Sequence, residues 1–562
     1  MEVVSLGAVL PFIGILTQPE KVFNSPSMGG VVQALGIVSG ADLVLPITIA
    51  FALASLAAGA TRLLLVWVST QFIYACGADL SIEVYRRTLY QPYRVHVASN
   101  SSTVISGIAK IGSAQATLQS IVSLGISVAM MVSIMLVLLY IDAMVATVSF
   151  VGFGVSYGLI TWLSRQSLLR NSQNISLEST QMVQVLQESL GGIRDVLLDG
   201  TQPLYCDIYR KSLLQVMRAH SNNNFMVMSP RYVMEVFGMV LIAALAYGLS
   251  RRAEGFTSAI PVLGALALGA QRLLPAMQQG YGAWSTMAAN QASLADAIKL
   301  LDQPLPEEVY QPVPAPLSFQ EAVRFDDVKF HYSSDSPWVL NDLNLTISKG
   351  SRIGFVGSTG SGKSTTLDLL MGLLEPTQGK ILVDGHPISG KRLRAWQQTI
   401  AHVPQSIFLA DSTLAENIAF GVPREAIDMD RVQQAACQAQ IADLIESRPK
   451  GYQALVGERG VRLSGGQRQR IGIARALYKR ASVLVFDEAT SALDNATEQK
   501  VIDAIKSLNR DLTILLVSHR LSTVQHCDTI IEMEYGRVVA QGTYKQLLED
   551  SPSFRKMVNT LA

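Results

Sequence analysis

The stretch Gly357–Ser364 constrains the fold more than any other part of this 562-residue chain. It reads Gly-Ser-Thr-Gly-Ser-Gly-Lys-Ser and fits the pattern G-x-x-x-x-G-K-S/T at every fixed position. The apolar run Ile353–Val356 predicts a strand before it, and Thr365–Leu373 predicts a helix after it. Such a loop wraps phosphate oxygens with backbone N–H groups at a helix N-terminus. We therefore expect a bound nucleoside triphosphate, with Lys363 on its outer phosphates and the Ser364 hydroxyl on Mg²⁺. A plain glycine-serine turn is the alternative, and the flanking strand and helix argue against it.

A pair of carboxylates further along the chain supports this interpretation. The apolar run Val483–Phe486 is of the buried-strand type and ends in Asp487 and Glu488. Open α/β sheets bind ligands at the carboxyl ends of their strands. We expect Asp487 to hold the shell of Mg²⁺ and Glu488 to orient or deprotonate the attacking water.

The segment Leu463–Gln467, which reads Leu-Ser-Gly-Gly-Gln, resembles the signature motif of ABC transporter ATPases. Ser464 and Gly466 precede a predicted helix at Arg468–Leu477, which makes a second anion site at a helix N-terminus. The resemblance implies that this motif binds the ATP held by another ATPase domain, so that two domains face each other head to tail. The ordinary alternative is a helix N-cap with a glycine-rich turn.

Further residues match the ABC pattern one by one. The resemblance implies that Tyr332 stacks on adenine, with His331 and Trp338 as nearby alternatives. It also implies that Gln405 senses Mg²⁺ and that His519, after the apolar run 513–517, contacts the γ-phosphate.

The resemblance thus gives three sets of site residues, and it covers residues 318–562. The catalytic set is Glu488, His519 and Gln405, and the metal set is Ser364, Gln405 and Asp487. The ATP-binding set of one chain is Tyr332, Gly357, Ser358, Thr359, Gly360, Ser361, Gly362, Lys363, Ser364, Thr365 and Asp487. The set that serves the partner's ATP is Ser464, Gly465, Gly466, Gln467 and Asp494.

Composition separates two parts of the chain. Hydrophobic residues make up 49% and charged residues 16%, a charged share below the roughly 25% of soluble domains. Residues 40–165 and 229–278 carry few charges. The net charge of +1 gives no electrostatic argument for nucleic acid. The four cysteines lack metal-ligand spacing and are interpreted as free thiols.

Five apolar runs have about the length of 20 residues that crosses a bilayer. They are Leu43–Val68, Leu118–Tyr140, Ala143–Leu163, Tyr232–Leu249 and Phe256–Leu274. A shorter run, Val3–Leu16, lacks the basic segment of a signal peptide and follows Glu2. We interpret it as the outer half of a truncated first span, which gives six spans and places the natural start upstream of Met1.

The long connections between spans indicate which side of the membrane holds the ATPase part. Ten basic residues of these connections favour the cytoplasmic side, and Arg251 and Arg252 oppose it. The ten are Arg86, Arg87, Arg94, Lys110, Arg165, Arg170, Arg194, Arg210, Lys211 and Arg218. The connections resemble the intracellular loops of ABC exporters, whose short coupling helices would lie near Gln91–Asn100 and Gly200–Arg210. By the same logic, the last span continues from Phe256 to about Leu301 as one helix.

Charged residues within apolar runs are candidates for the substrate pathway. Arg62 lies deep in the second span and Arg272 in the last. Both could face a water-filled pathway and suit an anionic substrate; the alternative is that they snorkel or pair within the protein. Arg231 and Glu235 are four residues apart and read as a simple i,i+4 ion pair.

Together these features resemble an exporter-type ABC half-transporter. The expected fold is a multi-domain chain, with an α-helical transmembrane domain at residues 1–303, a proline-rich linker at 304–317 and an α/β P-loop ATPase domain at 318–562. The resemblance implies ATP and Mg²⁺ as cofactors and ATP hydrolysis coupled to export or flipping. It also implies a second copy of the chain, or a similar half-transporter, as partner in a membrane, most simply the bacterial inner membrane.

The substrate is less constrained by the sequence. Three short segments resemble the lipid-linked oligosaccharide flippase of bacterial protein N-glycosylation: Leu10–Phe12, Ser25–Leu35 and Arg272–Pro275. This favours a (pyro)phosphate-linked glycolipid or lipid-linked oligosaccharide. Another lipid, a multidrug substrate and a nucleotide-gated channel remain as alternatives. The apolar runs argue against a soluble ABC ATPase of translation or DNA repair, and the fusion of both domains argues against an importer.

Overall fold

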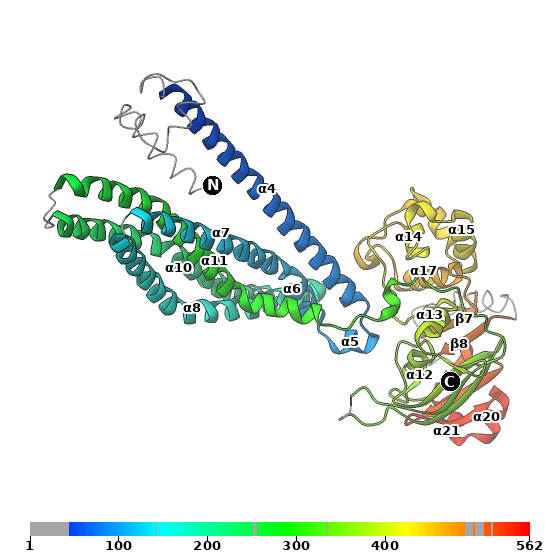
Figure 1. Ribbon diagram of the computed structural model, residues 1–562. Helices are drawn as coiled ribbons and strands as arrows, with labels where there is room; N and C mark the ends of the chain where they lie inside the picture. Colours follow the sequence, from blue (N-terminus) through cyan, green and yellow to red (C-terminus); the bar gives the residue numbers. More distant parts are fainter. Residues whose placement is uncertain are drawn as a thin grey trace. The chain divides into compact units, whose positions relative to one another are not determined.

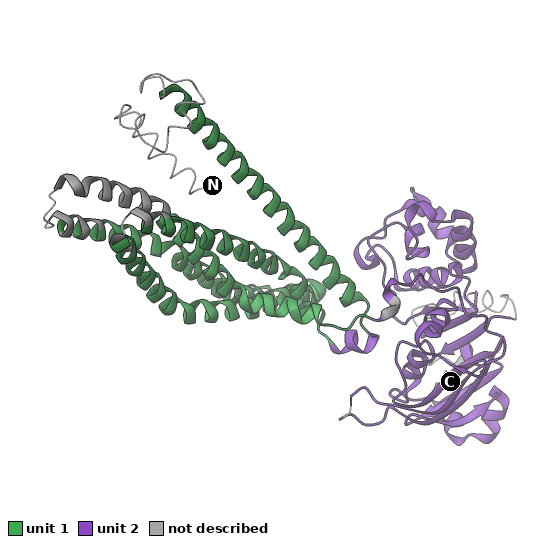
Figure 2. Cartoon of the chain, viewed as in Figure 1, with its two compact units in different colours: residues 1–91, 99–305 green, residues 92–98, 306–562 purple. Residues whose placement is uncertain are grey.

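The computed structural model describes residues 44–141, 143–250, 256–333, 335–488, 498–500, 511–518 and 521–561. The chain forms two compact units (Figure 2). The first comprises residues 1–91 and 99–305, and the second comprises residues 92–98 and 306–562. The domain boundaries and the linker at 304–317 drawn from the sequence stay a prediction.

The first unit is helical (Figure 1). Its helices are α4 (Val44–Leu89), α6 (Ser101–Ala109), α7 (Ile111–Ile141), α8 (Ala143–Gly191), α9 (Ile193–Leu198), α10 (Gln202–Ser250) and α11 (Phe256–Leu301). Helix α7 packs along α11, α8 packs along α10, and α11 also contacts α8 and α10. The 49 residues of α8 extend about 74 Å, far more than a bilayer of about 30 Å. The prediction that apolar runs continue as long helices is confirmed, including the single last helix from Phe256 to Leu301.

Three helical stretches among the described residues are long and apolar enough to cross a membrane: Val44–Leu89, Ser101–Leu136 and Ala146–Gly191. The predicted spans 232–249 and 256–274 lie within α10 and α11. The total of six spans stays a prediction. The segments Val3–Leu16, Leu10–Phe12 and Ser25–Leu35 lie outside the described residues.

The two predicted loop tips differ in outcome. Helix α5 (Tyr93–Ala98) lies inside the first predicted range and belongs to the second compact unit. The second predicted position, Gly200–Arg210, is wrong. The short helix between α8 and α10 is α9, which ends before this range, and α10 already begins at Gln202. The reason is that α8 ends at Gly191 and Gly192 caps α9, whereas Gly200, with φ of 64°, only turns the chain into α10. Gly191 and Gly192 therefore mark the start of α9, and Gly200 follows its end.

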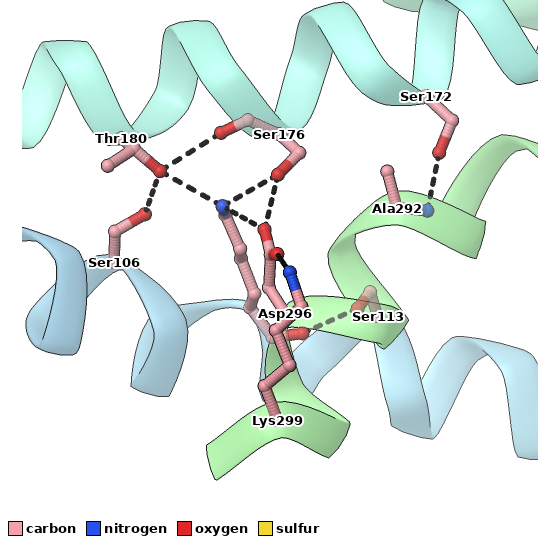
Figure 3. Close-up of polar contacts among 9 residues, drawn as sticks. Ser106, Ser113, Ser172, Ser176, Thr180, Ala292, Asp296 and Lys299 are labelled. Carbon is pink, nitrogen blue, oxygen red and sulfur yellow. Dashed lines mark hydrogen bonds and ion pairs between the residues drawn. The ribbon is translucent and has the colours of Figure 1, made fainter.

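A buried polar network ties the helices of the first unit together (Figure 3). The Lys110 ammonium, at the end of α6, donates to Ser176 Oγ at 2.8 Å and Thr180 Oγ1 at 3.0 Å on α8, and to Asp296 Oδ2 at 2.8 Å on α11. The Lys110 side chain is only 10% exposed and that of Asp296 32%. Burial acts to raise the pKa of Asp296, but the hydrogen bonds from Lys110 and Ser176 and the charges of Lys110 and Lys299 outweigh it and hold this pKa below its usual range. The network therefore favours the charged form of Asp296 and joins α6, α8 and α11.

Removing one partner of this pair should destabilise the helical unit. We expect Asp296→Ala to lower the free energy of unfolding by about 2–4 kcal/mol, because Lys110 would then be a buried charge without its counter-ion. Lys299→Ala is the matched control: this lysine contacts the same carboxylate at 3.5 Å but is 77% exposed, so its loss should cost less than about 1 kcal/mol. Thermal unfolding of the purified full-length chain in detergent measures both. Equal midpoints for the two variants would contradict the network's role.

The second unit contains two sheets. A four-stranded antiparallel sheet has the order β2 (Leu340–Ser348), β1 (Ala322–Phe330), β4 (Gln378–Val383) and β5 (His386–Pro387). A six-stranded sheet has the order β10 (Arg537–Gly542), β9 (Thr529–Glu534), β3 (Arg352–Val356), β8 (Thr513–Val517), β7 (Val483–Asp487) and β6 (Ile400–Val403). All its neighbouring pairs are parallel except β10 with β9.

Helices surround these sheets and complete two apolar cores. They are α12 (Lys363–Leu370), α13 (Gly390–Gln398), α14 (Leu414–Ile418), α15 (Met429–Gln438), α16 (Ala442–Glu446), α17 (Gly465–Tyr478), α19 (Leu521–Val524), α20 (Tyr544–Asp550) and α21 (Pro552–Leu561). Trp396 is fully buried in the core that joins both sheets to α12, and its indole N–H donates to Leu370 O at 2.7 Å. A second core lies beneath α14, α15 and α17. The predicted strand at 353–356 and the predicted helix after the loop are thus confirmed as β3 and α12. Both pack into the same apolar core.

Candidate functional site

The loop between β3 and α12 requires glycine at two positions. A Cβ at Gly357 would lie 2.2 Å from Met533 O, a distance that no side chain tolerates. Gly362, the N-cap of α12, has φ of 98°, a backbone conformation that favours glycine. These glycines let the chain turn tightly from the strand into the helix, so that the N-terminus of α12 faces the loop.

The lysine of the loop is held inside it. Lys363 is only 6% exposed, and its ammonium donates to Gly357 O at 3.0 Å and Ser358 O at 2.9 Å. Burial lowers the pKa of Lys363, while the nearby charges of Glu488 and Asp487 act in the opposite direction. A largely buried cation bonded to loop carbonyls has the chemistry to bind an anionic group such as phosphate.

The order of strands in the six-stranded sheet places Asp487 and Glu488 near the loop between β3 and α12. Asp487 is the last residue of β7, and in the described sheet β8 lies between β7 and β3. Parallel strands end at the same edge, so Asp487 and the loop lie one strand apart. Ser518 follows β8 between them and is buried. The predicted His519 is the next residue and lies outside the described residues.

Glu488 and Gln405 meet directly. The Gln405 amide donates to Glu488 Oε2 at 2.7 Å, although the two residues are 83 positions apart. Glu488 has φ of 50°, a conformation that costs energy for a residue with a Cβ, and its N–H donates to Val517 O at 2.9 Å. This strain, beside the contact with Gln405, supports the hypothesis that Glu488 is a functional residue.

The aromatic candidates separate by their contacts. Tyr332 Oη lies 3.2 Å from Thr365 Oγ1 on α12, and its ring packs edge-on against Phe330 at 5.0 Å. His331 and Trp338 instead pack against each other at 4.8 Å. Tyr332 is 41% exposed, which leaves surface for a stacked base. The geometry therefore favours Tyr332 over its two neighbours as the aromatic residue beside the loop.

The signature segment begins α17. Ser464 is the N-cap: its Oγ accepts from Gln467 N at 3.3 Å, and Gln467 Oε1 accepts from Ser464 N at 3.0 Å. The N-cap alternative is thus realised, but it does not use up the helix end, because first-turn N–H groups such as those of Gly465 and Gly466 have no intrahelical acceptor. Ser464 is exposed and the two glycines are partly exposed. Asp494 and the segment 491–494 lie outside the described residues.

Sequence reasoning missed one titratable residue at this site. Asp368 lies on α12, and burial together with the charge of Asp487 raises the pKa of Asp368 to about 6. The available signal was an acid between Leu367 and Leu369 in the first turns after the loop. Tyr93 of α5 is close by: burial and then the charges of Asp368 and Tyr332 raise the pKa of Tyr93. Asp368 thus adds a second carboxyl beside Asp487.

The raised pKa of Asp368 predicts a pH-dependent stability. The folded state prefers the neutral carboxyl, so this stabilisation is complete below the unfolded pKa of 3.8 and is lost as the pH rises through about 6. Asp368→Asn keeps the group neutral at every pH. We expect the variant to be more stable than the wild type at pH 8, by up to about 3 kcal/mol, and the difference to shrink toward pH 5. Thermal midpoints at the two pH values measure it, and an equal difference at both would refute the burial effect.

The donors around the loop fit Mg²⁺ held together with a nucleotide. The Ser364 hydroxyl, the Gln405 amide and the Asp487 carboxylate all offer oxygen, the ligand that this hard cation prefers. Among the described residues no group of three or more His, Cys, Asp or Glu side chains is placed to hold a metal. Since Mg²⁺ is commonly bound by one or two carboxylates plus substrate phosphates, this sparse set fits a metal that arrives with ATP.

Comparison with known proteins gives a consistent family. The ABC transporter family model matches residues 340–491. An ATP-dependent lipid A-core flippase of Saccharophagus degradans is 33% identical over 498 residues, which cover 86% of this chain and 81% of that protein. Flippases of the same name from Alkalilimnicola ehrlichii and Cupriavidus metallidurans are 39% and 44% identical, over 51% and 40% of this chain and 48% and 38% of their own lengths.

A solved structure extends the likeness to the whole fold. The structure of a bacterial Atm1-family ABC exporter with ATP bound matches with a TM-score of 0.80 and 25% sequence identity, over 99% of this chain and 98% of that one. Helices able to span a membrane and an ATPase unit therefore occur here in the same chain and the same order as in an exporter. The chain belongs to the ABC transporter family and is an integral membrane half-transporter of the exporter type, in which ATP hydrolysis drives transport.

Proposed function

We propose that this chain works as a homodimer that flips a (pyro)phosphate-linked glycolipid or lipid-linked oligosaccharide. It would do so across a bacterial inner membrane, with its ATPase units in the cytoplasm. The contact that carries the catalytic part of this proposal is the 2.7 Å hydrogen bond from Gln405 to Glu488 beside the phosphate-binding loop. A similar half-transporter as partner is the alternative assembly.

The catalytic roles follow from the chemistry of each group. Glu488 accepts a proton from the attacking water, and the Gln405 amide holds its carboxylate in place. Lys363, buried among the loop carbonyls, is the cation for the outer phosphates. Mg²⁺ with ATP, when bound, supplies the cation that neutralises charge developing on the transferred phosphoryl group. His519 is the proposed γ-phosphate contact.

Two exposed surfaces support a dimer. Ser464, Gly465, Gly466 and Gln467 present the N-terminus of α17 at the surface, where the ATP of a second chain can meet it; Asp494 is proposed to join them. Helix α4 exposes large apolar side chains such as Leu56, Leu63 and Trp67, at 70%, 74% and 62%. Apolar side chains this exposed need lipid or a partner chain to cover them.

The substrate class is supported by charge and by relatives. Arg62 is exposed on α4 within its apolar stretch, and Arg272 occupies the corresponding part of α11, where its side chain lies outside the described residues. Basic residues in apolar segments favour an anionic lipid over a cationic drug, because like charges repel strongly where the dielectric constant is low. The relatives are named as flippases of lipid A-core, and they come from bacteria.

Replacement of Glu488 tests the ATPase part of the proposal. We expect Glu488→Gln to keep ATP binding and to reduce steady-state hydrolysis at least about a hundredfold, because the amide preserves the shape but loses the charge that accepts the proton. Nucleotide retained after gel filtration should approach two ATP per two chains. Phosphate release and bound-nucleotide stoichiometry of the full-length protein are the two measurements. Near-normal hydrolysis in the variant would remove Glu488 from the catalytic role.

Replacement of the two arginines tests the substrate part. We expect Arg62→Gln with Arg272→Gln to reduce flipping of an anionic glycolipid in proteoliposomes about tenfold, through the loss of charge-assisted hydrogen bonds, and to leave basal ATPase largely intact. Arg170→Gln, exposed on α8 beyond its apolar run, is the matched control and should have no effect on flipping. Unchanged flipping in the double variant, or efficient export of cationic dyes by the wild type, would contradict an anionic substrate. An ATP-gated conductance without flipping would favour the channel alternative.

A further inference from the structure

A cavity that is open to the surface lies in the helical unit between α8, α10 and α11. Its volume is about 550 Å³. Six of its lining residues are polar: His220, Ser221, Asn223 and Asn224 on α10, and Thr286 and Asn290 on α11. Among the residues that the structure describes, the rest of the lining is apolar, and no Asp, Glu, Lys or Arg contributes to it.

Three polar side chains of this cavity are available to bind a ligand. The side chains of Ser221, Asn224 and Asn290 make no hydrogen bond with any of the residues that the structure describes. An amide both donates and accepts, as does a hydroxyl group of a sugar, so the set matches a neutral ligand rich in hydroxyl groups. A phosphate would instead call for arginine or lysine, which this lining lacks.

The walls of the cavity are held in place by hydrogen bonds between helices. On the side of α10, the Asn171 amide of α8 donates to Asn223 Oδ1 at 2.8 Å, and both residues are buried. Between α8 and α11, Ala292 N donates to Ser172 Oγ at 2.9 Å, two residues from Asn290 (Figure 3).

One helical turn further along α11, the network of Lys110, Ser176 and Asp296 fixes the same two helices (Figure 3). Because these walls are already fixed, ligand binding costs less conformational entropy.

The cavity lies beyond the apolar segments, toward the end of α11 that continues into the ATPase unit. Thr286 is about 18 Å past Leu274, the end of the apolar run in α11, at 1.5 Å per residue. Val227 is about 8 Å before Tyr232, where the apolar run of α10 begins. A water-facing headgroup whose lipid part occupies the apolar segments can reach this depth.

We propose that this amide-lined cavity binds the neutral sugar portion of the transported glycolipid on the ATPase side of the membrane. The proposal rests on the proposed function and narrows it, because it assigns the sugars to this cavity and leaves the phosphate to Arg62 and Arg272. It makes Asn224 and Asn290 specificity-determining residues for a glycosylated headgroup.

The experiment uses the full-length protein in nanodiscs and two probes: a polyprenyl pyrophosphate carrying an oligosaccharide, and the same polyprenyl pyrophosphate without sugars. The readout is the lipid concentration that gives half-maximal stimulation of ATPase. Asn224→Leu and Asn290→Leu remove the amides at similar side-chain volume. Asn222→Leu is the matched control, because Asn222 is exposed on the same helix and does not line the cavity.

We expect each cavity variant to raise the half-maximal concentration of the sugar-bearing lipid roughly tenfold, the cost of lost hydrogen bonds, and to leave that of the sugar-free lipid unchanged. Asn222→Leu should match the wild type with both lipids. A cavity variant that matches the wild type with both probes overturns the proposal, and so does one that loses response to both lipids equally. A wild type that responds to neither lipid refutes the proposed function itself, whatever the variants do.

Discussion

Burial of a lysine ammonium is the interaction on which each unit of this protein depends, and the two units satisfy it differently. In the helical unit, Lys110 has a carboxylate at 2.8 Å and two hydroxyl groups around it, so its charge is compensated within the fold. In the ATPase unit, the hydrogen bonds of Lys363 go to loop carbonyls and to a serine hydroxyl, and carboxylates act on it only through space. The first arrangement is a structural brace. The second keeps positive charge available, which supports the proposal that this lysine binds phosphate while Lys110 stabilises the helical unit.

The sequence predicted those parts of the structure that depend on local spacing. Glycine and lysine at fixed intervals after an apolar run define the loop, and long apolar runs define the helices, so both could be predicted from neighbouring residues alone. The position of the second short helix failed because two glycine signals lay close together, and local spacing does not say which one begins the helix. Contacts distant in sequence were out of reach: Lys110 and Asp296 are 186 residues apart, and only the packing of α11 brings them together.

The candidate site shows the same division. Asp487 and Glu488 were predictable because two acids end a buried strand, and Gln405 because a family motif carries it. Asp368 was missed, since its importance comes from burial beside Asp487 and not from any motif. The contact of Tyr332 with Thr365, which singles it out from two other aromatic candidates, likewise requires the folding of β1 against α12. The positions of these residues were thus predictable where a motif records them, and their surroundings were not; their roles stay predictions.

The positions of charged and neutral polar groups along the helices suggest how a single substrate meets the protein. Arg62 lies inside its apolar run, about 9 Å before its end at Val68, and Arg272 lies about 3 Å before the end of its run at Leu274, at 1.5 Å per residue. The amide-lined cavity lies further along α11, beyond the end of its apolar run at Leu274. An apolar segment, then basic residues, then neutral amides is the order of the parts of a glycolipid: acyl or prenyl chains, phosphate, sugars. A cationic drug has no group for the arginines, and a simple phospholipid has none for the amides. A glycosylated phosphate-bearing lipid is the substrate class that uses all three environments at once, because each of its parts then meets the chemistry that stabilises it.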